Sequence, residues 1–378
     1  MSYRVPTEEQ ALAVESFRKF LLAEVRPVAR TYRDRFIPKV TMRELTQRIA
    51  EFGLPGCTVP VEHGGMGWSY ATQAMLFEEL AACSFDIALC VMSNMGLAAT
   101  LLDAAAELRE RYLPETLAGR LFGANGLGER RLGSHGTEIA AARDRDHLMV
   151  NGAMTGIING VYSDVFVCAV RTESGLSHLL IDREAHGYEA YRVDRVALDA
   201  QSTTQILIAD ARVPTTNLIG EEGEGLRDMA GLSARASMHV GVLAVGLMRV
   251  ALDESIACAT KNIGFGKVIA SHQLMAAKLA DMAISTDAAR LMCQRAFSMR
   301  DAGVCCDLQA SMALAFAADA AVRVCGDAAR LHGASGMAHD FDVERLVRDA
   351  MTISIMGGAP EMLQLGIARA LTGVAVFE

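Results

Sequence analysis

The sequence is short of proline, of clustered basic residues and of long uncharged apolar runs, and each shortage excludes a class of protein. Only 8 of 378 residues are proline while 51% are hydrophobic, so a disordered chain is excluded and a large buried core is expected. The net charge is −9 and the sequence contains no dense Lys or Arg cluster, which argues against a nucleic-acid partner. No segment reaches the roughly 20 uncharged apolar residues of a membrane span, so none is expected.

Metal-ligand and disulfide patterns are also missing. The 9 cysteines are scattered, only Cys305 and Cys306 are adjacent, and neither a CxxC pair nor a Cys/His ligand spacing occurs. These residues are therefore expected to be buried free thiols in a reducing cytoplasm, with no metal site. Residues 1–10 lack a basic region followed by an apolar run, so secretion is not expected and a cytoplasmic location is.

The hydrophobic pattern divides the chain into three parts. Apolar residues recur at three- and four-residue spacings up to about residue 121, short β-branched runs separated by Gly, Asn and Asp follow, and long Ala/Leu/Met-rich stretches then return. The long stretches at 240–258, 273–300 and 308–331 each predict a bundle helix. The sequence therefore predicts an α+β, mainly α fold, divided as follows: an N-terminal helical domain (1–121), a middle β-barrel-like domain (122–228) and a C-terminal four-helix-bundle domain (229–378).

Six segments carry a resemblance to a known family. In chain order they lie at 56–67 (GCTVPVEHGGMG), 128–135 (GERRLGSH), 151–160 (NGAMTGIING), 211–225, 265–273 and, in the tail, 331–336 through 343–350. Together they resemble the acyl-CoA dehydrogenase family across nearly the whole chain. The resemblance implies two helical domains around a β domain, bound FAD, and a homo-oligomer, either a dimer or a dimer of dimers.

The resemblance also implies which residues hold FAD. The flavin-ring segments contain Asn125, Leu127, Gly128, Ser134, Gly156, Ile157 and Ile158, and the adenosine and pyrophosphate segments contain Phe265, Gln273, Arg330, Gly333 and Ala334. Several side chains depart from the family pattern: His135 replaces an Asp, Gly156 replaces a Trp and Asn262 replaces an Arg. Because many family contacts to the flavin come from backbone amides, FAD is still expected.

The catalytic carboxylate of the family is missing. Its usual position is Gly357 here, and the alternative position used by some members aligns with Ala236. His239 and His332 are weak candidates for a replacement base: His239 lies among apolar neighbours, where a histidine is more often a core residue, and His332 lies at a segment expected to contact the flavin. Glu361, one helical turn away, is interpreted as structural. The same resemblance places the substrate near Ser134, Ser237 and Gly357.

Three interpretations remain open. The favoured one is an FAD-dependent oxidoreductase that oxygenates an acyl thioester, linked to coenzyme A or to a carrier protein. The second is α,β-desaturation of such a thioester by a base other than a carboxylate. The third is a non-catalytic subunit that pairs with an active homologue in a hetero-oligomer.

Overall fold

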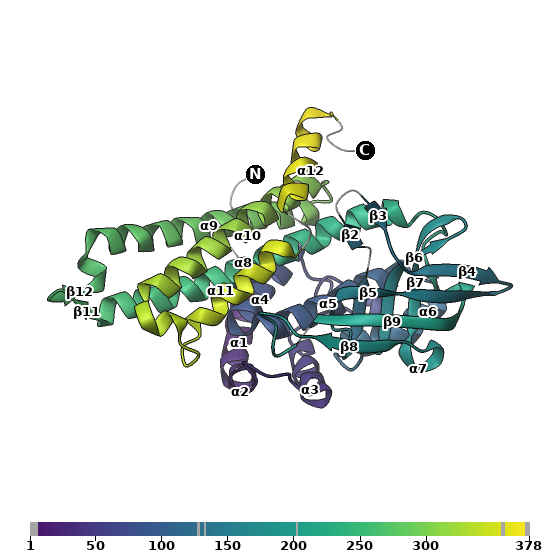
Figure 1. Cartoon of the computed structure of the whole chain (residues 1–378), viewed down its shortest axis with the longest axis horizontal. Coiled ribbons are helices and arrows are strands. Elements are labelled where there is room, and N and C mark those ends of the chain that lie inside the picture. Colours follow the sequence, from purple (N-terminus) through teal and green to yellow (C-terminus); the bar gives the residue numbers. More distant parts are fainter. Residues whose placement is uncertain (1–6, 127–128, 132–133, 202, 357–359, 375–378) are drawn as a thin grey trace. The chain divides into compact units, whose positions relative to one another are not determined.

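The structure is a computed structural model that describes residues 7–126, 129–131, 134–201, 203–356 and 360–374 (Figure 1). The chain forms two compact units, which are described separately. Unit 1 comprises Met1–Leu21, Ala74–Phe85 and Ser233–Val376. Unit 2 comprises Leu22–Gln73, Asp86–Leu232 and Phe377–Glu378.

The described part of unit 1 is helical apart from one short hairpin. Its main bundle helices are long because alanine and other good helix formers fill them without glycine or proline breaks in most turns. Its elements are α1 (Glu8–Phe20), most of α4 (Tyr70–Cys83), most of α8 (Gly225–Lys261), the hairpin strands β11 (Ile263–Gly264) and β12 (Lys267–Val268), η4 (Ile269–Ser271), α9 (Gln273–Asp301), α10 (Asp307–Leu331), η5 (Gly333–Met337), α11 (Val343–Ile355) and α12 (Pro360–Thr372).

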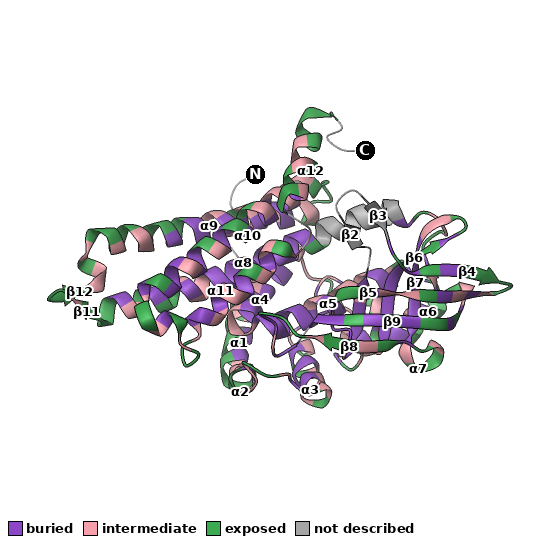
Figure 2. Ribbon diagram, in the orientation of Figure 1, coloured by how far each residue is buried: buried purple, intermediate pink, exposed green. Residues whose placement is uncertain are grey.

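Small residues set the helix packing in unit 1. The buried face of α10 repeats alanine at three- and four-residue spacings, as at Ala310, Ala313 and Ala317, so neighbouring helices can approach closely. Gly246 of α8 lies where α4 crosses, because a Cβ atom built there would be 2.8 Å from Ala81 Cβ. Figure 2 shows the resulting buried stripe along α8 and α10.

Unit 2 combines short helices with a β-sheet. The helices pack on the sheet through an apolar cluster in which Leu97 and Leu101 of α5 meet Val165 and Val167 of β6. Its helical elements are η1 (Leu21–Val25), α2 (Arg26–Thr31), α3 (Lys39–Ala50), η2 (Val61–His63), α5 (Phe85–Leu102), α6 (Ala106–Leu117), α7 (Arg183–His186) and η3 (Thr215–Asn217).

The main sheet of unit 2 has the strand order β10-β7-β6-β4-β5-β9-β8, with β1 added parallel to β6. The long strands β5 and β9 lie side by side and antiparallel, as Figure 1 shows. The strands are β1 (Gly123–Gly126), β4 (Ala140–Asp144), β5 (His147–Ile158), β6 (Val165–Thr172), β7 (Gly175–Asp182), β8 (Glu189–Val193), β9 (Thr203–Pro214) and β10 (Leu218–Ile219); β2 (Glu129–Arg131) and β3 (Ser134–Gly136) form a separate hairpin.

The helical, β, helical order predicted from the sequence is confirmed. Helices predicted at 273–300 and 308–331 occur as α9 and α10. The helix predicted at 240–258 is only part of α8, which begins at Gly225, inside the stretch predicted to be β. The exact three-domain division remains a prediction.

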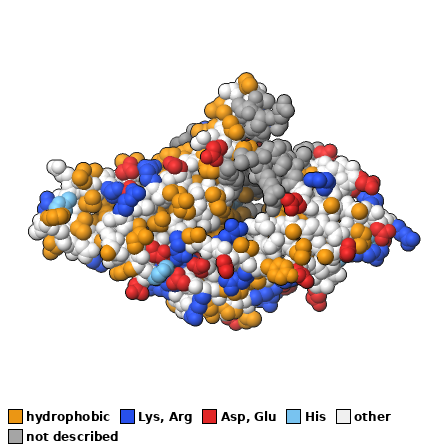
Figure 3. Space-filling view, in the orientation of Figure 1, with side chains coloured by type: hydrophobic (Ala, Val, Ile, Leu, Met, Phe, Trp, Pro, Cys, Tyr) orange, Lys and Arg blue, Asp and Glu red, His pale blue; other side chains and the backbone are white. Residues whose placement is uncertain are grey.

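Most cysteines, and much of the two most apolar helices, are buried. All nine cysteines are free and six of them are buried, as expected for packed thiols. Two helices, α5 and α10, are long and apolar enough to cross a membrane by length and composition alone. In their most apolar windows 72% and 50% of the residues, respectively, are already buried inside the protein. On the face drawn in Figure 3, basic and acidic side chains are interspersed.

Candidate functional site

Asn125 of β1 presents a buried acceptor at the predicted flavin-ring site. Its side-chain Nδ2 donates to the backbone carbonyl of Ser93 at 2.8 Å, which fixes the orientation of the amide. The Oδ1 atom is buried and accepts no hydrogen bond from any residue that the structure describes. A buried acceptor without a donor is costly, so this oxygen is suited to receive an N–H from a bound group.

The end of β5 supplies open space at the predicted flavin face. Gly156 is exposed with φ of +74°, and no heavy atom of the described residues lies within 4 Å of a Cβ atom built there. The pairing of β5 with β9 shifts register between Met154 and Ile157, so the strand bulges at this point. Ile157 is buried in the core of the sheet and Ile158 is half-buried, so Ile157 can offer a ligand only its backbone.

The strand β1, which carries Asn125, and the strand β5, which carries Gly156, are neighbours within unit 2. A Cβ atom built on Gly126 would be 2.5 Å from Met154 Sδ, so β1 runs directly against β5. Of the remaining predicted ring contacts, Ser134 lies in β3 with its backbone opposite Arg131 of β2. Leu127 and Gly128 lie outside the described residues.

In unit 1 the hairpin after α8 carries a fully exposed aromatic ring. Phe265 has a relative exposure of 101% and φ of +50°, a backbone region that non-glycine residues rarely adopt. The edge of the ring contacts His272 at a centroid distance of 6.1 Å, and His272 Nε2 is hydrogen-bonded to the carbonyl of Gly264 at 2.9 Å. Gln273 follows as the first, exposed residue of α9. An exposed, held ring of this kind is a stacking surface for a base.

The start of α9 and the end of α10 lie together. Lys278 Nζ is 2.6 Å from Asp327 Oδ1, and the same carboxylate oxygen is 3.2 Å from Arg330 Nη1. Gly333, with φ of +61°, and Ala334 follow and are exposed. The predicted adenosine and pyrophosphate residues therefore gather at one end of unit 1, where a base and a phosphate group fit an open ring and a guanidinium. The residues present fit FAD.

The two histidines proposed as replacement bases have different surroundings. His239 is 1% exposed and lies edge-on to Phe77 at 5.5 Å and to Phe297 at 5.1 Å, in the core of unit 1. His332 is half-buried at the end of α10, and its Nδ1 donates to the carbonyl of Ala328 at 2.8 Å. The proton of a neutral His332 is thereby assigned to Nδ1, which leaves Nε2 as the acceptor nitrogen.

The remaining substrate positions are only partly defined. Ala236 is exposed on α8, while Ser237, the next residue, is 3% exposed and therefore largely packed within unit 1. Gly357 lies outside the described residues. Neither Ala236 nor Gly357 has an ionisable side chain.

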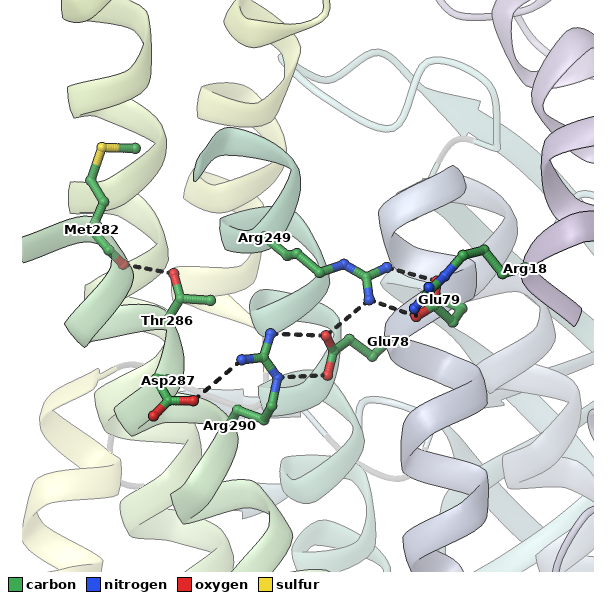
Figure 4. A network of polar contacts seen from close by, with 8 residues as sticks. All are labelled: Arg18, Glu78, Glu79, Arg249, Met282, Thr286, Asp287 and Arg290. Carbon is green, nitrogen blue, oxygen red and sulfur yellow. Dashed lines mark hydrogen bonds and ion pairs between the residues drawn. The ribbon is translucent and has the colours of Figure 1, made fainter. Parts of the chain in front are cut away.

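An ion-pair network that the sequence pattern did not predict joins α8 to α1, α4 and α9 (Figure 4). Glu79 of α4 is 5% exposed and accepts paired hydrogen bonds from Arg18 and from Arg249, at 2.6 to 2.9 Å. Its neighbour Glu78 accepts from Arg249 at 3.2 Å and from Arg290 at 3.0 and 3.1 Å. Burial would raise the pKa of Glu79, but the two guanidinium groups outweigh burial and lower it. The only sequence signal was a Glu-Glu pair within an apolar helix.

A second missed feature is a buried amide network behind Asn125. Asn94 Oδ1 accepts the backbone N–H of Gly123 at 2.9 Å, Asn159 Nδ2 donates to the carbonyl of Cys90 at 3.0 Å, and Gln201 Nε2 donates to Asn159 Oδ1 at 2.8 Å. These bonds fix the start of β1 against α5. The signal was the polar Ser93-Asn94 pair within the otherwise apolar stretch of α5.

Comparison with known proteins agrees with this geometry. Residues 7–120 match the N-terminal domain of acyl-CoA dehydrogenase and residues 223–372 match its C-terminal domain. An acyl-CoA dehydrogenase of Bacillus subtilis is 30% identical over 97% of this chain and 99% of its own length. A short-chain-specific acyl-CoA dehydrogenase of Clostridium acetobutylicum is 28% identical over 96% of this chain and 97% of its own.

The fold agrees as well. The crystal structure of an acyl-CoA dehydrogenase from Geobacillus kaustophilus superposes with a TM-score of 0.92 at 27% identity, covering 98% of this chain and 100% of that one. The predicted fold class, the flavin-dependent oxidoreductase activity and the FAD cofactor are thereby confirmed. The chain belongs to the acyl-CoA dehydrogenase family of FAD-dependent acyl-CoA oxidoreductases.

Proposed function

We propose that this flavoenzyme oxygenates an acyl thioester instead of desaturating it. The observation that carries the proposal is a double absence: neither Gly357 nor Ala236, the two positions at which the family is expected to place its glutamate, has a carboxylate. Desaturation begins with removal of the α-proton of the thioester, and a positioned general base contributes ~10²–10⁴-fold to such a step. Without that base the usual reaction loses its first step.

Neither histidine replaces the carboxylate convincingly. The ring of His239 lies between Phe77 and Phe297 in the core of unit 1, which keeps it from an open acyl site. His332 is the better placed of the two, because Nε2 is its acceptor nitrogen, and it supports desaturation with a histidine base as the second candidate function.

The residues of the chain have separable roles in the proposed reaction. When bound and reduced by an external two-electron donor, the flavin would supply the site of reaction with dioxygen and the two electrons that convert the second oxygen atom to water. Asn125 Oδ1 would accept a hydrogen bond from the bound ring, and the open space beside Gly156 would leave room for a second reactant. Small side chains at Gly156, Ala236 and Gly357 would accommodate a bulky or cyclic acyl group, carried on coenzyme A or on a carrier protein.

The full set of proposed FAD contacts extends beyond these residues. The set is Asn125, Leu127, Gly128, Ser134, Gly156, Ile157, Ile158, Phe265, Gln273, Arg330, Gly333 and Ala334, with Ser134, Ser237 and Gly357 next to the substrate. We further propose a cytoplasmic homo-oligomer, a dimer or a tetramer, because large apolar side chains such as Leu274 and Ile284 remain exposed along α9.

Labelled dioxygen tests the proposal. The FAD-loaded protein is reduced chemically under anaerobic conditions and mixed with a candidate acyl-CoA. Isotopically labelled dioxygen is then added, and the mass of the acyl product is measured by mass spectrometry. Oxygenation predicts one labelled oxygen atom in the acyl product, with the second leaving as water. A panel of short, branched and cyclic thioesters that yields only the unchanged thioester or the product lacking two hydrogens would overturn it.

The control separates loss of cofactor from loss of chemistry. The absorbance spectrum of the purified protein, before and after incubation with FAD, must show a bound flavin for the oxygen result to count. A chain without any flavin band after incubation would contradict FAD binding itself. The variant His332→Gln should leave oxygenation in place, whereas desaturation by a histidine base would disappear.

A further inference from the structure

A polar cavity lies wholly within unit 2, beside the start of β1. Its volume is about 500 Å³, within the range of small-ligand sites. It opens between α3, the end of α6, the start of β6 and α7. The lining residues are Arg43, Tyr112, Glu115, Arg120, Leu121, Asp164, Val165, Asp182, Arg183 and Glu184.

Three of the four carboxylates in this cavity already have partners. Glu115 forms a paired ion bridge with Arg120, with two contacts of 2.7 Å. Asp164 accepts from Lys39 Nζ at 2.5 Å and from a backbone N–H at 2.9 Å. These contacts neutralise the charges of Glu115 and Asp164, so neither carboxylate is available to pair with another cation of the cavity.

Asp182 is held still more tightly. Its carboxylate accepts from the Tyr112 hydroxyl at 2.7 Å, from Arg111 at 3.2 Å and from the backbone N–H groups of Glu184 and Ala185. Burial would raise the pKa of Asp182, but these hydrogen bonds outweigh it and lower the pKa, so the group stays ionised. Glu184, the fourth acid, is exposed to solvent.

Two arginines of the cavity lack a carboxylate of their own. The guanidinium of Arg43 comes no closer than 3.9 Å to Asp164, which Lys39 already occupies, and its Nε atom is buried with no hydrogen-bond partner among the described residues. Arg183 donates to the carbonyl of Val161 at 3.1 Å and lies over the Tyr188 ring, without an ion pair to any described residue. A buried guanidinium N–H without an acceptor costs free energy that an oxyanion would recover.

We propose that this cavity binds a small oxyanion, a carboxylate or a phosphate group, through Arg43 and Arg183. The lining holds three arginines and four carboxylates, and Lys39 and Arg111 pair with two of those carboxylates, Asp164 and Asp182. With these partners counted, five basic groups balance four acidic ones and leave one positive charge in excess. That balance suits a singly charged group better than a polyphosphate. The Nε–H of Arg43 donates to the anion, Arg183 supplies the second cation, and Leu121 and Val165 form the apolar wall.

Calorimetric titration of the FAD-loaded protein with butyrate and, separately, with inorganic phosphate tests this site. Saturable binding of at least one anion is expected, and the preferred anion distinguishes a carboxylate from a phosphate ligand. Arg43→Gln and Arg183→Gln should each weaken binding by about tenfold or more, since each removes a charge-assisted hydrogen bond. Arg43→Lys keeps the charge but loses the Nε–H, so it should also bind more weakly than the parent protein.

Arg48→Gln is the matched control. Arg48 lies on the same helix, α3, and is paired with Glu24 outside the cavity, so the substitution removes the same charge without touching the site. It should leave the affinity unchanged. Absence of saturable binding of both anions, or an equal loss in Arg48→Gln, would overturn the proposal. Flavin absorbance confirms that each variant is folded and loaded.

Discussion

Replacing Glu79 by glutamine should destabilise unit 1 by much more than an ordinary surface ion pair would suggest. The carboxylate is 5% exposed and accepts four hydrogen bonds from Arg18 and Arg249. Glutamine has the same shape but no charge, and its amide N–H groups would face guanidinium N–H groups. Breaking a buried ion pair costs ~3–5 kcal/mol. Arg18 is half-exposed and Arg249 keeps Glu78, so we expect a loss of about 2–4 kcal/mol.

Urea-induced unfolding followed by circular dichroism measures this loss. The matched control is Glu115→Gln, which breaks an equally short pair with Arg120 in which both side chains are about half exposed. Surface pairs contribute ~0–1 kcal/mol, so the control should change the free energy of unfolding by less than about 1 kcal/mol. A Glu79→Gln protein as stable as the control would refute the argument that the network is buried and coupled.

The same network predicts a direction for acid sensitivity. The pKa of Glu79 is lower in the folded protein than its ordinary value of 4.5, so the folded state favours the ionised group. The stabilisation is therefore fully present above pH 4.5 and is lost as the pH falls through the lower, folded-state pKa. The parent protein should lose more stability than Glu79→Gln over that acid range, as measured by urea unfolding at a series of pH values.

Five further substitutions, in three tests, examine packing and cofactor contacts. Gly246→Ala places a Cβ atom 2.8 to 3.1 Å from atoms of α4 and should lower the free energy of unfolding by ~1–3 kcal/mol. Gly326→Ala in α10, where no described heavy atom lies within 4 Å of the new Cβ atom, should raise it by ~0.5–1 kcal/mol. Urea-induced unfolding measures both changes. Phe265→Ala should weaken FAD binding about tenfold in a fluorescence titration, while Ile263→Ala in the same hairpin should not. Asn125→Ala should shift the flavin absorption maxima, because the ring loses its hydrogen-bond acceptor; an unchanged spectrum would place Asn125 away from the ring.

The sequence predicted helices and strands well where the spacing of apolar residues stayed helical or stayed alternating over the whole element. The helices α9 and α10 follow from three- and four-residue spacings of alanine and other apolar residues, and the alternation of β9 follows from its period of two. The start of α8 did not follow, because Gly225, Gly231 and two serines lower the local helix propensity of this stretch.

Contacts between distant segments could not be predicted from such patterns. Glu79 meets Arg18 and Arg249, which lie 61 and 170 residues away, and nothing local marks these three residues as partners. The same limit applies to Asn125, whose amide orientation is fixed by the carbonyl of Ser93, 32 residues away in α5. By contrast, the sequence preference for His239 as a core residue is confirmed, because burial among apolar neighbours is a local property.

The most direct test of the missing base is the anaerobic reduction of bound flavin by substrate. Oxidised, FAD-loaded protein is mixed with acyl-CoA thioesters in a stopped-flow spectrophotometer, in parallel with the Gly357→Glu variant. The proposed loss of the base predicts that flavin bleaching in the parent protein is at least ~100-fold slower than in the variant, since a general base contributes ~10²–10⁴-fold. Rapid bleaching of the parent protein, at a rate that Gly357→Glu does not increase, would contradict it.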